Sequence, residues 1–435
     1  MAIHSKRIVK LPAVKILVLG SGGREHALVW KIKQSPLVSQ VFCSPGNAGI
    51  AQLCECFKGD PIEIARQLGA DFVVVGPDGM LADGVVDRLN AAGFLAFGPT
   101  QSAARLESSK IWTKTLLQKY GVPTAKFATF DSAREAKAYL HAQDEGAFVV
   151  KADGLAVGKG VVVAATKDEA VAGVDEVLGI ASQTVQGDAG RVLIEEMMSG
   201  PEVSFFALCD GQNLLPLIEV QDHKRAFDGD VGPNTGGMGC YSPVPFWNQE
   251  LREQVIETIL KPTLEGLKSD GVEYRGVLYC GLMITEDGPK VIEYNARFGD
   301  PECQILMTLC ESDIVPALLA CAGSKDYSLS EIEFGWRDEA ALLVVLAASG
   351  YPATPRRDDP IIGLESVADT LVFHAGTRAE NGRILTAGGR VLGVLGTGAN
   401  FAQARHKAYE AVSHIHFEGA HFRSDIGKLA MSEAK

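Results

Sequence analysis

The chain has 435 residues, of which 46% are hydrophobic and 22% are charged. This composition is typical of soluble globular proteins, and the length suggests roughly three domains. The net charge of −13 argues against a nucleic-acid backbone as the main partner. No apolar run approaches the roughly 18 residues of a membrane span, and the nine cysteines form no CxxC pair. We therefore expect a cytoplasmic protein with reduced thiols and no membrane partner.

The first 13 residues, MAIHSKRIVKLPA, are basic. They lack the apolar core and the small-residue cleavage site of a secretion signal. We expect this stretch to be a disordered extension, followed by an N-terminal domain over residues 14–114.

Short apolar runs alternate with helical patterns in this N-terminal region. The runs are VKILVLG (14–20), VFCS (41–44), DFVVVGPDG (71–79) and FLAFGPT (94–100). Buried parallel strands have this apolar character, and strands that alternate with helices form an open, mostly parallel α/β sheet.

Three glycine-rich turns follow strands of that predicted sheet: GSGGREH (20–26), SPGNAG (44–49) and VGPDG (75–79). The first is not a dinucleotide fingerprint, because Glu25 stands where the third glycine would be. Bare amides at a helix N-terminus beside Arg24 suit a phosphate group, although a turn needed only for packing is the alternative. Ligands bind beyond the carboxyl ends of such strands, so we expect a pocket there.

Residues 115–335 have a different pattern, in which strands pair with nearby strands. We predict one long helix over 102–121, a helix over 131–142, and strands within 122–130, 146–166 and 191–211. We also predict a loop without secondary structure over 222–245, a helix over 249–268, and an antiparallel hairpin over 276–299. From residue 336 onward, three apolar strands and a helix over 401–413 predict a third domain, 336–435.

The segment KADGLAVGKG (151–160) joins two apolar strands. Glycines allow a loop to close over phosphate groups, and lysines supply charge without fixed geometry. No Lys-Ser or Lys-Thr pair opens a helix here, so the segment is not a Walker A loop. The alternative is an ordinary hairpin tip.

Two further segments carry polar groups that need an explanation. IEEMMSGPE (194–202) combines acids with methionines, as an adenine slot with a ribose carboxylate, Glu202, would require; an ordinary strand end is the alternative. DHKRAFDGDVGPNTGGMG (222–239) crowds Asp222, His223, Lys224 and Arg225 together, and long structureless loops are usually functional. His223 taken singly is more often a surface histidine than a catalyst.

The stretch VIEYNARFGDPE (291–302) places Glu293, Asn295 and Arg297 two residues apart. If the chain is extended, all three side chains project from one face. Carboxylate and amide oxygens suit Mg²⁺, which completes its shell with water and nucleotide phosphates, and Arg297 could hold a carboxylate substrate. The alternative is a solvated sheet face with a chance alternation of polar groups.

Together these segments resemble the glycinamide ribonucleotide synthetases (phosphoribosylamine–glycine ligases) of the ATP-grasp superfamily. The segments are VLGSGGREHAL, PGNAG, FGPT, VVKADGLAVGKGVVVA, DHKRAFDGDVGPNTGGMGCYSP and VIEYNARFGDPE. They occur in the family's order and span about residue 15 to residue 427. The resemblance implies an N-terminal domain, a central ATP-grasp fold of two α+β subdomains with a mobile lid at about 125–200, and a small C-terminal α+β domain.

The resemblance also implies the reaction. ATP, glycine and 5-phosphoribosylamine would give ADP, phosphate and glycinamide ribonucleotide through glycyl phosphate, a step of purine biosynthesis. The expected cofactors are ATP and Mg²⁺ or Mn²⁺, and we expect a monomer. Two alternatives are another ATP-grasp carboxylate–amine ligase and a nucleotide-binding protein without turnover.

Site residues are assigned from the same resemblance. The metal would be held by Glu293 and Asn295, and the catalytic set would be Arg297 on the glycine carboxylate with Asp222 and Lys224 between the substrates. The nucleotide would be bound by Lys110, Lys151, Gly154, Gly158, Lys159, Gly160, Glu195, Glu196, Met198 and Glu202. Phosphoribosylamine and the remaining substrate contacts would involve Gly22, Gly23, Arg24, Glu25, Gly46, Asn47, Asp78, Asn234, Gly236, Gly237, Met238 and Asp300.

One position departs from the family pattern. The family has G-P-E-x-P-L near the third strand, whereas this chain has GPDGML (76–81). Asp78 keeps the negative charge but is one methylene shorter, so a contact from this carboxylate to the ribose would be weaker.

Overall fold

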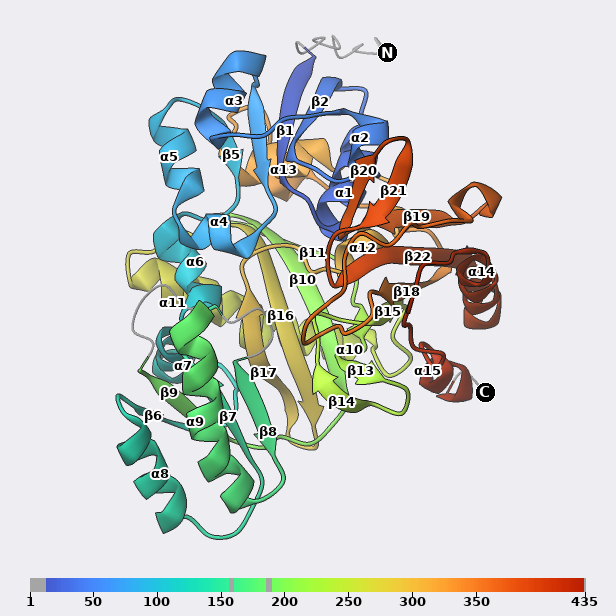
Figure 1. Cartoon of the computed structure of the whole chain (residues 1–435). Helices are drawn as coiled ribbons and strands as arrows, with labels where there is room; N and C mark the ends of the chain where they lie inside the picture. Colours follow the sequence, from blue (N-terminus) through green and yellow to red (C-terminus); the bar gives the residue numbers. More distant parts are fainter. Residues whose placement is uncertain (1–12, 156–159, 185–189, 434–435) are drawn as a thin grey trace.

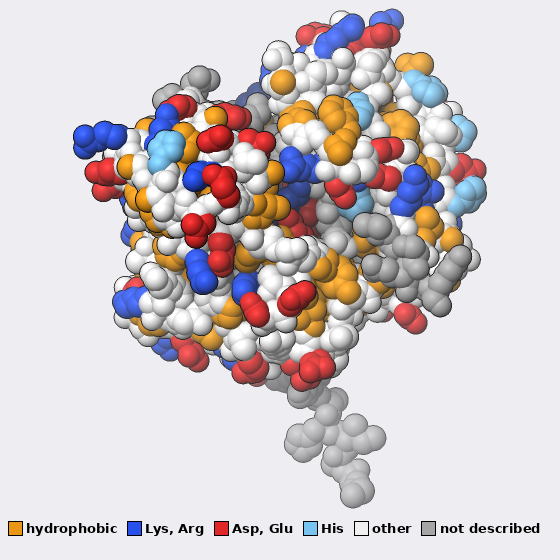
Figure 2. Space-filling view, turned by 90° about the horizontal axis from the view of Figure 1, so that it is seen from below, with side chains coloured by type: hydrophobic (Ala, Val, Ile, Leu, Met, Phe, Trp, Pro, Cys, Tyr) orange, Lys and Arg blue, Asp and Glu red, His pale blue; other side chains and the backbone are white. Residues whose placement is uncertain are grey.

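A computed structural model describes residues 13–155, 160–184 and 190–433 of the chain. Twelve of the 13 residues predicted to form a disordered extension therefore lie outside the described residues. Within these ranges, no helix has the length and hydropathy needed to traverse a bilayer. On the face drawn in Figure 2, acidic, basic and apolar side chains are intermixed.

The N-terminal part is the predicted parallel α/β sheet. Its strand order is β3-β2-β1-β4-β5, and every pairing is parallel. Side chains of β1 alternate between two cores: Ile16 and Val18 pack on one face, and Leu17 and Leu19 on the other. The strands are β1 (Val14–Gly20), β2 (Val38–Pro45), β3 (Glu55–Cys56), β4 (Phe72–Val75) and β5 (Leu95–Phe97).

Helices cover both faces of this sheet (Figure 1). They are α1 (Gly23–Ile32), α2 (Ile50–Leu53), α3 (Pro61–Leu68), α4 (Asp78–Ala82) and α5 (Val85–Ala91). Because β2, β1 and β4 are neighbours and run parallel, the turns that follow them meet at one edge of the sheet. The sequence prediction that three glycine turns share an edge is confirmed.

The long helix predicted over 102–121 is wrong, because the chain forms two helices, α6 (Gln101–Ser108) and α7 (Lys110–Lys119). Ser109 between them has an extended backbone, and its side chain caps α7 by accepting from the Trp112 N–H. The Ser109 hydroxyl also donates to Asp153, 3.1 Å away. A serine that bonds locally in this way competes with helix continuation and starts a new helix.

A four-stranded antiparallel sheet of order β6-β9-β7-β8 lies at the lower left of Figure 1 and packs against two helices. It corresponds to the segment predicted to act as a lid. Its elements are β6 (Phe127–Phe130), α8 (Ala133–Ala142), β7 (Phe148–Ala152), β8 (Val161–Ala164), α9 (Lys167–Thr184) and β9 (Val192–Glu196).

The central antiparallel sheet has the order β11-β10-β16-β17. The predicted hairpin is confirmed, since Tyr279 of β16 pairs with Asn295 of β17 and Gly281 pairs with Glu293. Tyr294 and Ala296 point into a buried core, which leaves the residues between them on the opposite face. The strands are β10 (Glu202–Asp210), β11 (Leu214–Pro216), β16 (Arg275–Thr285) and β17 (Gly288–Asn295).

Helices also flank the central sheet. The predicted helix over 249–268 is a continuous run of α10 (Gln249–Val255), a π-helical turn (Ile256–Leu260) and α11 (Lys261–Ser269). Beyond β17 the chain forms two buried helices, α12 (Glu302–Leu309) and α13 (Val315–Cys321).

The loop predicted over 222–245 is wrong, since this stretch contains four short strands. They are β12 (Gln221–Asp222), β13 (Arg225–Phe227), β14 (Val231–Asn234) and β15 (Gly239–Ser242). β15 pairs with β18 over Gly239–Val344 to Ser242–Ala341. Hydrogen bonding to a distant strand, which local sequence does not reveal, gives β15 its extended form, whereas β13 and β14 pair with each other.

The last sheet therefore combines strands from two distant parts of the chain, in the order β12-β15-β18-β22-β19. The three C-terminal strands and the helix that were predicted are confirmed, and a hairpin was missed. These elements are β18 (Ala340–Ala347), β19 (Leu371–His374), β20 (Thr377–Glu380), β21 (Arg383–Thr386), β22 (Arg390–Gly398), α14 (Phe401–His414) and α15 (Lys428–Glu433).

Two buried histidines join the first turn of α1 to β19. The backbone N–H of His374 donates to Nδ1 of His26 at 2.7 Å, so that nitrogen carries no proton and the His26 ring is neutral. Burial and, less strongly, the charge of His374 lower the pKa of His26 to about 3. Burial also lowers the pKa of His374 to about 4.

This pair predicts acid-sensitive stability. Below about pH 6.5 the unfolded chain protonates both histidines, whereas the folded chain does not. The free energy of unfolding should therefore decrease as the pH falls from about 6.5 to about 4, by up to about 1.4 kcal/mol per pH unit for each histidine. Urea unfolding at several pH values should show a shallower decrease for His374→Asn than for the wild type.

The matched control is His406→Asn, because His406 is exposed and lies beside Glu410 on α14. Its unfolding free energy should follow the wild-type pH dependence. An unchanged slope in His374→Asn would contradict the prediction.

Candidate active site

The glycine-rich turns of the N-terminal sheet are built around one carboxylate, that of Glu25. It accepts from the Gly22 N–H at 2.6 Å and from Arg24 Nε at 2.6 Å, and it is buried. A β-carbon at Gly20, Gly22 or Gly76 would overlap the Glu25 side chain. The Glu25 side chain occupies the space that side chains at these positions of GSGGREH and VGPDG would need. This explains why glycines stand there.

The turn after β2 is ordered by Asn47. Its amide donates to the carbonyls of Ser21 and His374, each at 2.8 Å, and its Oδ1 accepts from the N–H groups of Gly49 and Ile50 at 2.9 Å. These four bonds use both N–H donors and both acceptor positions of the Asn47 amide. Asn47 therefore positions the turn and has no hydrogen-bonding group left for a ligand. Gly46 beside it has φ +71°, which favours glycine.

Arg24 and two carboxylates lie next to these turns. Arg24 Nη1 donates to the Phe298 carbonyl at 3.1 Å, and the backbone N–H of Arg24 donates to Asp300 Oδ2 at 3.3 Å. Burial raises the pKa of Asp78, but the guanidinium groups of Arg297 and Arg24 more than offset this, so the net pKa is lowered. Asp78 is therefore a carboxylate at neutral pH, and it faces both arginines.

The break between α6 and α7 places Lys110 at the lid. Asp153, which bonds the Ser109 hydroxyl, also accepts from the Ile111 N–H at 3.1 Å. Lys110 Nζ then donates to the Gly154 carbonyl at 2.8 Å. Gly154 has φ +109°, a conformation that glycine adopts readily. These bonds bring Lys110 to the glycine loop. Gly160 is buried at the loop's other end, whereas Gly158 and Lys159 lie outside the described residues.

Lys151 is held by a buried charge cluster. Glu195 forms ion pairs with Lys151 at 2.7 Å and with Lys114 at 2.6 Å, and all three side chains are at most 4% exposed. Burial raises the pKa of Glu195, but the two lysines more than offset this and the net pKa is lowered. The Glu195 side chain is thus committed to the two lysines.

The chain after Glu195 is more open. Met198 is half-buried, and Met197 is 50% exposed. Glu196 accepts from the Lys126 N–H at 3.0 Å. An apolar slot for a base would use these methionines and the backbone beside them.

Glu293 lies at the electrostatic centre of the site. Burial raises the pKa of its carboxyl, but the ammonium groups of Lys224, Lys151 and Lys110 and the guanidinium of Arg297 lower it further than burial raises it. These four cations come from separate segments. An anion bound beside Glu293 would therefore interact with several cationic groups.

Arg297 and Asn295 lie on the same side as expected for alternate residues. Arg297 Nη2 donates to Asn295 Oδ1 at 3.0 Å and contacts Glu107 Oε1 at 2.9 Å, while Nη1 donates to the Phe298 carbonyl at 3.2 Å. Arg297 Nε is buried and has no hydrogen-bond partner among the described residues. A buried donor without a partner is costly, and a substrate carboxylate would satisfy it.

Lys224 lies in the segment 222–239, which carries predicted substrate contacts and is called the substrate segment below. It joins this segment to Glu202 at the start of β10. Its Nζ lies 3.0 Å from Glu202 Oε2. Burial lowers the pKa of Lys224, but Glu202, Asp222 and Glu293 together raise it well above its ordinary value. Burial raises the pKa of Asp222 to about 7, although Lys224 lowers it. The predicted pair Asp222 and Lys224 therefore lies between Glu202 and Glu293.

The glycine turn of the substrate segment is partly accessible. Asn234 is half-buried and Gly236 is exposed, whereas Gly237 is buried. Met238 is fully buried, its N–H donates to the His223 carbonyl, and its own carbonyl accepts from Val345. The structure thus does not support a substrate contact through Met238.

The donor set at Glu293 and Asn295 fits a hard divalent cation. One carboxylate and one amide oxygen are what Mg²⁺ takes from a protein when nucleotide phosphates and water supply the rest. Within the described ranges, no group of three or more His, Cys, Asp or Glu residues could hold a metal by itself. A metal at this position would therefore be shared with the nucleotide.

Sequence analysis missed several residues that complete the site. Lys114 lies four residues after Lys110 on α7. Residues with this spacing share one face of a helix, so the sequence could have placed Lys114 beside Lys110. Asp153 stands inside the quoted glycine loop. Glu107 had no such signal, because its contact with Arg297 joins residues 190 positions apart.

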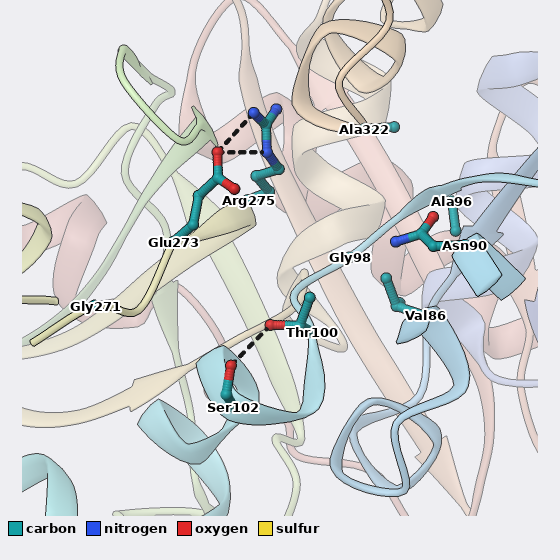
Figure 3. A pocket seen from close by; sticks show the side chains of 10 residues that line it. All are labelled: Val86, Asn90, Ala96, Gly98, Thr100, Ser102, Gly271, Glu273, Arg275 and Ala322. Carbon is teal, nitrogen blue, oxygen red and sulfur yellow. Dashed lines mark hydrogen bonds and ion pairs between the residues drawn. The ribbon is translucent and has the colours of Figure 1, made fainter. Parts of the chain in front are cut away.

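The cavity drawn in Figure 3 is separate from this site. It has a volume of about 240 Å³ and lies where β5 and α5 meet the start of β16. Arg275 at its rim donates to Glu273 Oε1 through Nε and Nη2, at 3.0 and 2.7 Å. None of the predicted site residues lines this cavity.

The chain matches one protein family along most of its length. The matching descriptions are the phosphoribosylglycinamide synthetase N domain over residues 14–107, the ATP-grasp (A) domain over 108–303 and the C domain over 341–429. A phosphoribosylamine–glycine ligase of Rhizobium meliloti is 48% identical over 428 residues, which cover 96% of this chain and 99% of that protein. That of Caulobacter vibrioides is 49% identical with the same coverage.

Solved structures agree with these matches. The crystal structure of a phosphoribosylamine–glycine ligase from Thermotoga maritima has a TM-score of 0.82 at 36% identity, covering 95% of this chain and 100% of that one. The biotin carboxylase domain of Hydrogenobacter thermophilus 2-oxoglutarate carboxylase, in complex with MgADP, has a TM-score of 0.71 at 16% identity, covering 94% and 91%. The second likeness shows the ATP-grasp fold alone.

The charge cluster around Glu195 leads to a prediction about stability. Lys114→Ala leaves a buried carboxylate with Lys151 as its remaining ion-pair partner. Because Lys151 still compensates the Glu195 charge, we expect the cost of one lost buried partner, about 1–3 kcal/mol of the free energy of unfolding, measured by urea denaturation.

Lys126→Ala is the matched control. Lys126 is 90% exposed and lies 4.0 Å from Glu196, so its removal should change the unfolding free energy by less than about 1 kcal/mol. Equal effects of the two substitutions would contradict a buried charge cluster that stabilises the lid.

Proposed function

The chain belongs to the phosphoribosylglycinamide synthetase family, and from this membership we propose how its residues perform the family's reaction. The protein is an ATP-dependent ligase that joins glycine to phosphoribosylamine in purine biosynthesis. The observation that carries the proposal is that Arg24, from the turn that Glu25 orders, and Arg297, just after the strand of Glu293, both donate to the Phe298 carbonyl.

We propose that the reaction proceeds in two steps. A glycine carboxylate oxygen attacks the γ-phosphorus of ATP, the bond to the β,γ-bridging oxygen breaks, and ADP leaves. The amine nitrogen of phosphoribosylamine then attacks the carbonyl carbon of glycyl phosphate, phosphate leaves, and the nitrogen loses a proton. The intermediate forms on the substrate, so the protein supplies position, charge and exclusion of water.

The nucleotide side uses residues of the lid and the central sheet. Lys151, fixed by Glu195, and Lys110, held at Gly154, would bind the phosphates. Met198 and the backbone beside it would border adenine. Glu202 would accept from the ribose hydroxyls, which requires it to leave its ion pair with Lys224.

The metal would be Mg²⁺ or Mn²⁺, held by Glu293 and Asn295 together with phosphate oxygens. When bound, it would neutralise charge on the transferring phosphoryl group. The lid loop, with its glycines at 154 and 160, would cover the phosphates and protect glycyl phosphate from hydrolysis.

The acceptor side uses the sheet edge and the strand end. Arg297 would bind the glycine carboxylate through Nε, its donor without a partner. The turn 22–24 and the turn at Gly46 would hold the phosphate of phosphoribosylamine at the N-terminus of α1. Asp78 and Asp300 would face the sugar, and Asp222 with Lys224 would lie where the two substrates meet.

Three broader features are part of the proposal. We assign an N-terminal domain to residues 14–114, an ATP-grasp domain to 115–335 and a C-terminal domain to 336–435. We assign a monomer to the functional state. All nine cysteines are free, which supports a reducing, cytoplasmic location.

A coupled assay of ADP release tests the function. Release should depend on both glycine and phosphoribosylamine. Release that needs a different acid or amine would indicate another ATP-grasp ligase, and tight ATP binding without release would indicate a protein without turnover.

The first prediction for this site concerns Glu293. Glu293→Ala should abolish ADP release while the circular dichroism spectrum and the melting temperature remain close to wild type, because the residue lies on a polar sheet face. Glu286→Ala in the exposed turn of the same hairpin is the control and should keep full activity. Near-normal turnover of Glu293→Ala at low Mg²⁺ would remove the metal assignment.

The second prediction concerns Arg297. Lysine lacks the planar fork and an Nε donor, so Arg297→Lys should raise the KM for glycine by at least about tenfold and the KM for ATP far less. Initial-rate kinetics with each substrate varied in turn measures both. An unchanged glycine dependence would exclude Arg297 from the carboxylate site.

A further inference from the structure

Arg390 in the first position of β22 reaches out of the C-terminal sheet into the substrate side of the site. Its Nη1 donates to the carbonyls of Gly236, Gly237 and Asp300. Its Nη2 lies 3.8 Å from the Asp300 carboxylate. One guanidinium thereby joins the glycine turn of the substrate segment to the strand-end turn after Arg297.

The Asp300 contact extends this connection to the N-terminal sheet. Asp300 Oδ2 accepts from the Arg24 N–H, and β-carbons at Gly22 or Gly23 would crowd its carboxylate, at 2.9 and 3.4 Å. Burial raises the pKa of Asp300, but Arg390 and Arg24 more than offset this, so the pKa is lowered and the group stays charged. Arg390 thus acts on the first glycine turn through Asp300.

The C-terminal part also binds the glycine turn from a second residue. The Gly236 N–H donates to the Tyr351 hydroxyl at 3.1 Å, and the Tyr351 ring lies against Gly389, next to Arg390. A β-carbon at Gly236 would lie 2.9 Å from Arg390 Cζ. The turn therefore packs its bare backbone directly on the guanidinium, which explains the glycine at this position.

We propose that Arg390 is a positioning residue for phosphoribosylamine: it fixes the 236–237 turn and Asp300 against the turn 22–24. The residue touches no reacting atom and acts through these three segments. The inference rests on the proposed placement of phosphoribosylamine at the turn 22–24.

Lysine cannot replace arginine in this role. The planar guanidinium places two nitrogens at once, Nη1 at the three carbonyls and Nη2 beside the Asp300 carboxylate, whereas an ammonium is a single point of charge. Displacement of substrate-holding groups by about 1 Å can cost about 100-fold in rate.

The test is steady-state kinetics of Arg390→Ala, Arg390→Lys and the control Arg383→Ala, with all three substrates varied. Arg383 is an exposed arginine in the same part of the chain. We expect Arg390→Ala to raise the KM for phosphoribosylamine by about 10- to 100-fold, and Arg390→Lys to restore little of it. The KM for ATP should change less than about twofold, and guanidinium ion added well below denaturing concentration should partly restore Arg390→Ala.

Two outcomes would overturn the inference. One is an unchanged KM for phosphoribosylamine in a folded Arg390→Ala protein. The other is an equal loss in every kinetic constant that follows a lower melting temperature and shows no rescue by guanidinium. Arg24→Ala tests separately whether phosphoribosylamine binds at the turn 22–24. If Arg24→Ala changes the KM for ATP and leaves the KM for phosphoribosylamine unchanged, that placement is wrong, whatever the result for Arg390.

Discussion

Four cationic side chains from separate segments act on one half-buried carboxylate, that of Glu293. Charges of one sign repel when they are brought together away from water, so each must be balanced by an acid. Lys151 is balanced by Glu195, Arg297 by Glu107 and Lys224 by Glu202. These ion pairs hold the lid, helix α6 and the substrate segment at the site. The same cations would interact with a bound triphosphate.

The acceptor side depends on backbone shape more than on net charge. Glu25 occupies the space of three glycine side chains, and Asn47 uses its amide to order the neighbouring turn. The N–H groups of Gly22 and Arg24 donate to Glu25 and Asp300, so hydrogen bonds hold the turn at the start of α1 in one conformation. The N-terminal sheet therefore contributes a turn fixed by hydrogen bonds, while the lid and the central sheet contribute cations held by ion pairs.

The sequence predicted the parallel sheet, the hairpin of Glu293 and the glycine turns, because strand periodicity and turn composition are local properties. It failed at Ser109 and over residues 222–245, where a side chain of the lid and a strand 100 residues away decide the backbone. The same limit applies to the site. Lys110 and Arg297 stand in recognisable motifs, whereas Glu107 and Arg390 gain meaning only through contacts between distant segments.

The pairing of β15 with β18 has a consequence for protein engineering. The segment 221–242 is hydrogen-bonded into the C-terminal sheet on one side and packed beside the central sheet on the other. A graft of residues 221–242 onto another ATP-grasp scaffold would expose an unpaired strand edge. Exchange of acceptor specificity between such enzymes would require the C-terminal sheet to be transplanted together with the segment.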